Sequence, residues 1–117
     1  MRGKSQGQMQ ALKASQESIE AVLNEFEHIE FSHEDKGIKV TVFGSMKMKL
    51  VESIDDKFSA EDFTFVYDQA IEKLEYDKSV KLAKIRNEVQ TKFKFDLASF
   101  LPEVQKAVDY LNARNKA

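Results

Sequence analysis

The side chains best suited to acid–base or metal chemistry are few in this chain and poorly spaced for it. His28 and His33 are the only histidines, and Glu30 lies between them. On a strand, positions 28 and 33 point to opposite faces, so the sequence does not predict a shared metal ion. The chain has no cysteine, which excludes a thiolate metal site and a cysteine nucleophile. We therefore expect neither a metal nor a cofactor.

Motifs for nucleotide binding and nucleophilic catalysis are also missing. The four glycines are isolated from one another, so no glycine-rich loop could hold a phosphate group. No serine has the pattern of a nucleophile elbow. We therefore expect that this protein is not an enzyme.

The basic residues are grouped in blocks, although the formal net charge is −2. Residues 1–16 contain basic residues and no acid, residues 17–35 contain acids and no lysine or arginine, and residues 78–94 have Glu88 as their only acid. A local positive field can attract an anionic partner that the net charge would not predict. The alternative is that these blocks are ordinary solvated helix faces. Chosen by charge, the residues that we expect to contact duplex DNA are Arg2, Lys4, Lys13, Lys78, Lys81, Lys84, Arg86, Lys92 and Lys94.

A hairpin is the clearest structural element in the sequence. Residues 37–55 alternate apolar and polar residues on both sides of Gly44, which we expect to supply the tight turn. The two apolar faces should point inwards, with the methionines in the core. A preceding strand carries Ile29 and Phe31. The inward-facing residues of the hairpin are Ile38, Val40, Val42, Met46, Met48 and Leu50.

Helical patterns flank this sheet on both sides. The first helix is predicted from about Gln8 to Glu27, after a loose arm over residues 1–7. Ser59 should cap a long second helix that reaches about residue 94. Pro102 suits the first turn of a further helix within residues 95–117. The predicted fold is α+β: a single domain over 1–117, in which a helix–sheet–helix core (8–94) precedes an additional C-terminal helix.

One hairpin is too small to cover the apolar seam of the first helix, which predicts a homodimer. The seam repeats at intervals of three and four residues, the spacing by which a helix packs on another helix. The residues expected at the dimer interface are Leu12, Ile19, Leu23, Phe26, Val40, Val42 and Met48.

Three stretches together resemble the YbaB/EbfC family of bacterial nucleoid-associated proteins. They are the start of the chain with its following helix (GQMQALKASQ), the hairpin (GIKVTVFGSMKMKLVESID) and the long helix with DQAIEKLEYD in its register. The resemblance covers roughly residues 1–92. It implies a helix–sheet–helix dimer that binds DNA through protruding helices with little sequence preference, in the nucleoid of a bacterial cytoplasm.

Two features depart from that family. The chain is acidic overall, and residues 96–117 are predicted to form a helix where the family usually has a flexible tail. They favour an alternative function, that of a scaffolding dimer that binds an unidentified protein partner and no DNA. No apolar run is long enough for a membrane span and no secretory signal is expected, so no membrane partner is expected either.

Overall fold

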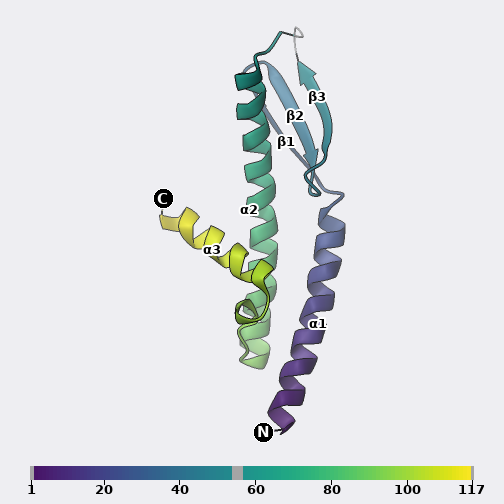
Figure 1. Ribbon diagram of the computed structural model, residues 1–117, viewed down its shortest axis with the longest axis vertical. Helices are drawn as coiled ribbons and strands as arrows, with labels where there is room; N and C mark the ends of the chain where they lie inside the picture. The colour runs from purple at the N-terminus through teal and green to yellow at the C-terminus, as the bar shows by residue number, and fades with distance from the viewer. Residues whose placement is uncertain (1, 54–56, 117) are drawn as a thin grey trace. The chain divides into compact units, whose positions relative to one another are not determined.

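The computed structural model describes residues 2–53 and 57–116, without the side chains of residues 2–6, 8 and 116. Its elements follow the order α1 (Arg2–Phe26), β1 (Glu30–Asp35), β2 (Ile38–Phe43), β3 (Met48–Ser53), α2 (Ala60–Phe93), the short 3-10 helix η1 (Leu97–Ser99) and α3 (Pro102–Lys116) (Figure 1). The predicted α+β class and element order are confirmed. The chain forms two compact units, so the single-domain organisation stays a prediction.

The first unit, which we call the sheet unit, comprises Asn24–Glu75. Its three antiparallel strands have the order β1-β2-β3, with β2 in the centre. Three side chains of β2 are almost fully buried with three side chains of α2, and Phe26 joins the same cluster. The apolar alternation of the central strand therefore faces the helix, as the sequence predicted. The six residues are Ile38, Val40, Val42, Val66, Ala70 and Leu74.

Gly44 has a different role from the predicted one. The left-handed residue after β2 is Met46, with φ of 72°, whereas Gly44 has no such φ. A Cβ atom on Gly44 would overlap the carbonyl oxygen of Phe26 at the end of α1. That oxygen accepts a hydrogen bond from the Ile29 amide at 3.0 Å. Glycine is needed here because the backbone of α1 passes too closely for any side chain.

The prediction that Met46, Met48 and Leu50 fill the core is wrong. These side chains are 47%, 45% and 47% exposed, and the half-buried apolar residue of β3 is Val51. The pairing between β2 and β3 shifts by one residue between Thr41 and Val42, where β3 has an extra residue. Such a bulge changes which side chains share a face, so strict alternation does not continue along β3.

The second unit, which we call the helical unit, comprises residues 2–23 and 76–116 of the described chain. Its core joins one residue of α1 and two of α2 to the segment after α2. The C-terminal segment is therefore part of the packed core of this unit, and Pro102 begins α3 as predicted. The buried cluster consists of Ile19, Leu82, Val89, Phe95, Leu97, Ala98, Val104 and Ala107.

Helix α1 begins earlier than predicted, since residues 2–7 are helical and do not form a loose arm. Gly3 and Gly7 lower the helix propensity of this segment by about 1 kcal/mol each without forbidding a helix. Helix α2 agrees with its prediction at both ends, and the Ser59 hydroxyl accepts a hydrogen bond from the Asp62 amide at 3.0 Å. In the ranges that the structure describes, no helix has the length and apolarity needed to cross a membrane.

Candidate nucleic-acid interface

All the basic residues expected at DNA belong to the helical unit. The side chains of Arg2 and Lys4 lie outside the described residues. The remaining cations differ in exposure, because Lys13, Lys84, Lys92 and Lys94 are exposed whereas the other three are half-buried. Those three are Lys78, Lys81 and Arg86.

Two of the half-buried cations already have acidic partners. The Lys81 ammonium lies 2.6 Å from a carboxylate oxygen of Asp77, one helical turn away on α2. The Arg86 Nε atom donates to Asp96 at 3.2 Å. Asp77 and Asp96 therefore compensate two positive charges that were predicted from the sequence to contact DNA. Lys81 and Arg86 are weaker candidates for phosphate contact for this reason.

Asp96 has a structural role of its own. It is the N-cap residue of η1, and its carboxylate accepts a hydrogen bond from the Ala98 amide at 3.1 Å. The hydrogen bond from Arg86 is the main reason that the pKa of Asp96 lies below its usual value, and the Ala98 amide lowers it further. The Arg86–Asp96 contact therefore fixes the turn between α2 and α3.

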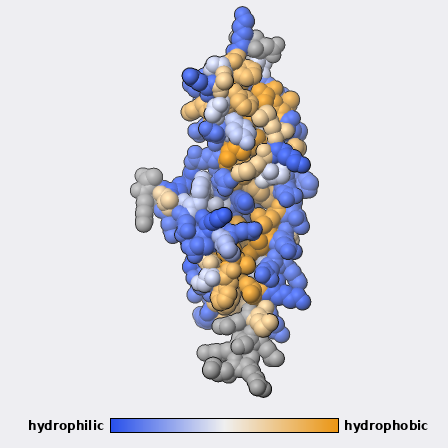
Figure 2. Space-filling view, in the orientation of Figure 1, coloured by the Kyte–Doolittle hydropathy of each residue, from blue (hydrophilic) through white to orange (hydrophobic). Residues whose placement is uncertain are grey.

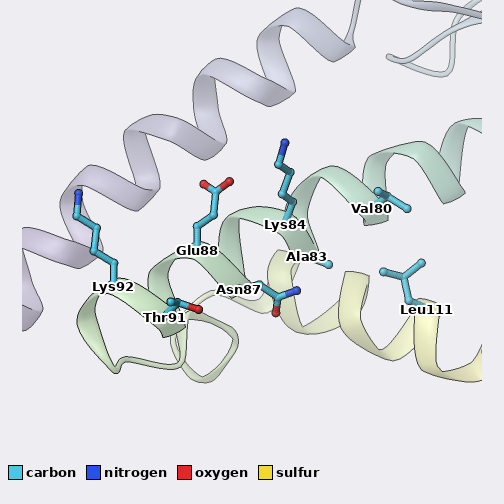
Figure 3. A pocket seen from close by; sticks show the side chains of 8 residues that line it. All are labelled: Val80, Ala83, Lys84, Asn87, Glu88, Thr91, Lys92 and Leu111. Carbon is cyan, nitrogen blue, oxygen red and sulfur yellow. The ribbon is translucent and has the colours of Figure 1, made fainter.

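The exposed cations Lys84 and Lys92 line an open groove along α2. The groove has a volume of about 810 Å³ and is also lined by Asn87 and Thr91, with Leu111 contributed by α3. Among the described residues, Lys84 has no ion-pair partner, and Lys92 has only an aromatic contact with Phe93, whose ring centroid lies 5.5 Å away. The lining of this groove includes two lysines, an amide and a hydroxyl, which are groups that donate hydrogen bonds to phosphate oxygens. The two lysines extend from one side of α2, and Asn87 and Thr91 extend from the other (Figure 3).

Glu88 interrupts this basic surface. Lys84, Glu88 and Lys92 extend from the same side of α2, each one helical turn from the next (Figure 3). At about 1.5 Å of rise per residue, the two lysines are about 12 Å apart along the helix axis. A carboxylate between them weakens the attraction of an anion, so this surface suits low-affinity binding.

Lys92 also borders a second, smaller groove between α1 and α2. This groove has a volume of about 240 Å³ and is lined on α1 by Ala14, Ser15 and Ser18. Ser15 is buried, and its hydroxyl donates to the Ala11 carbonyl within α1. The second groove places Lys92 beside the helix that carries Lys13, so α1 and α2 both contribute cations to the helical unit. Lys94 follows α2 in a left-handed conformation, with φ of 56°.

The residues expected at a dimer interface pack mostly within a single chain. Ile19, Phe26, Val40 and Val42 are buried, each in the core of its own unit. Leu12 and Leu23 pack half-buried against the core of the helical unit, and only Met48 is exposed. Six of these seven residues therefore offer little surface to a second copy, and their contact with one stays a prediction.

His28 precedes β1, and His33 lies within it. His28 is exposed, and the Nε2 atom of His33 lies 3.9 Å from a carboxylate oxygen of Asp35. Within the part of the chain that the structure describes, no group of three potential ligands is close enough to hold a metal ion.

Five residues that line the first groove were not predicted from the sequence: Val80, Ala83, Asn87, Thr91 and Leu111. Asn87 and Thr91 follow Lys84 at three and seven residues and point to the other side of α2 from the two lysines (Figure 3), so a helical face drawn through Lys84 and Lys92 does not include them. Leu111 could not be found from spacing along α2, because it belongs to α3 and reaches the groove through the tertiary packing of the helical unit. Comparison with known proteins adds no assignment, since no protein-family model matches this chain and no curated protein matches it.

Proposed function

We propose that this protein binds the phosphate backbone of duplex DNA as a homodimer, without reading base sequence, and organises the chromosome or regulates its use. The observation that carries the proposal is the wall of α2 with Lys84 and Lys92, whose charges are exposed and have no acidic partner in the described chain. The resemblance to the YbaB/EbfC family supports the same function. The family's DNA-binding role is inferred for this chain from that resemblance alone.

The competing function is that of a scaffolding dimer without DNA binding. The net charge of −2 favours it, as does Glu88 between the two lysines. The packed C-terminal segment adds a helix that could carry a protein-binding surface. The two functions differ in what they require of Lys84 and Lys92, because only DNA binding depends on both positive charges.

A salt titration on generic duplex DNA tests the proposal. Each phosphate contact contributes about −0.9 to the slope of log affinity against log salt concentration. The double substitution Lys84→Ala with Lys92→Ala should flatten the slope by about 0.9 for each lysine removed, equally on every DNA sequence. Glu88→Gln should raise the affinity a few-fold, because it removes the carboxylate between the two lysines.

Lys81→Ala is the matched control. Its ammonium already has Asp77 as a partner, so its loss should change the slope much less than the loss of Lys84. Circular dichroism should show an unchanged fold for all of these variants, because exposed charges and a single ion pair within one helix contribute little to stability. Absence of binding at low salt by the folded wild-type protein would exclude DNA binding and leave the scaffolding function.

A further inference from the structure

We draw no further inference here: the strongest candidate, the outer edge of β3 in the sheet unit with its half-exposed apolar side chains (orange in Figure 2), carries no assignment, because the exposed Lys47 and Glu52 along that edge suit an acidic strand, a basic strand and an antiparallel second copy alike, and nothing in the structure shows what covers it.

Discussion

Gly44 is a single residue on which the junction between α1 and the sheet depends. Gly44→Ala should lower the free energy of unfolding by about 1–3 kcal/mol, because its methyl group would displace the Phe26 carbonyl. Urea denaturation measures the change. Gly7→Ala is the control, since nothing lies within 4 Å of its added Cβ and alanine favours the helix by about 0.5–1 kcal/mol. If Gly44→Ala were as stable as the wild type, the backbone of α1 would not approach Gly44 as closely as described.

Asp96 makes the stability of the helical unit depend on pH. Asp96→Ala should cost about 1 kcal/mol at pH 7, since it removes the N-cap of η1 and the partner of Arg86. Because the folded pKa of Asp96 is depressed, its contribution is complete above the ordinary aspartate pKa of about 3.9. The contribution is lost as the pH falls through the lower folded value.

Urea denaturation of wild type and Asp96→Ala at several pH values checks this dependence. The difference between the two proteins should narrow as the pH falls below about 4. Asp68→Ala is a suitable control, because Asp68 is an exposed aspartate in the interior of α2 and should cost no stability. A difference that stays constant down to acid pH would show that the Asp96 charge does not stabilise the fold.

At the scale of elements, η1 and α3 belong to the core of the helical unit. Leu97 is 0% exposed, so Leu97→Ala should cost about 2–5 kcal/mol. Leu111→Ala removes the same atoms from the half-buried wall of the groove and should cost clearly less. Thermal or urea unfolding of both variants makes the comparison. Similar losses would contradict the described packing of the C-terminal segment.

Among the elements, the hairpin shows where periodicity stops being informative. The alternation of Ile38, Val40 and Val42 predicted the inner face of β2 correctly. The same alternation failed on β3, because the bulge shifts its register and because an edge strand lacks a neighbour that would bury its side chains. Nothing in the alternation of residues 46–50 distinguishes a central strand from an edge strand.

At the scale of the whole molecule, we expect a homodimer. Sedimentation at micromolar concentration should give a mass near twice 13.4 kDa. The physical reason is the apolar surface that one chain leaves exposed on the helical unit, at Met9, Phe93 and Phe100. A folded protein that sediments at 13.4 kDa would refute the dimer. In that case the burial of Ile19 and Phe26 within one chain would be sufficient for folding.

The sequence by itself determined the α+β class, the order of the elements and the position of α2, because these depend on local periodicity, on the Ser59 cap and on Pro102. It also located the basic segment of α2, since charge is read directly from residue types. The spacing of Asp77 and Lys81, one turn apart on α2, is enough to indicate their ion pair, whereas only the tertiary structure decided that Arg86 is compensated. Asp96 lies ten residues beyond Arg86, and the turn after α2 brings the two together. Burial, and ion pairing between separate elements, depend on which elements meet in space, which residue spacing along one helix or strand does not specify.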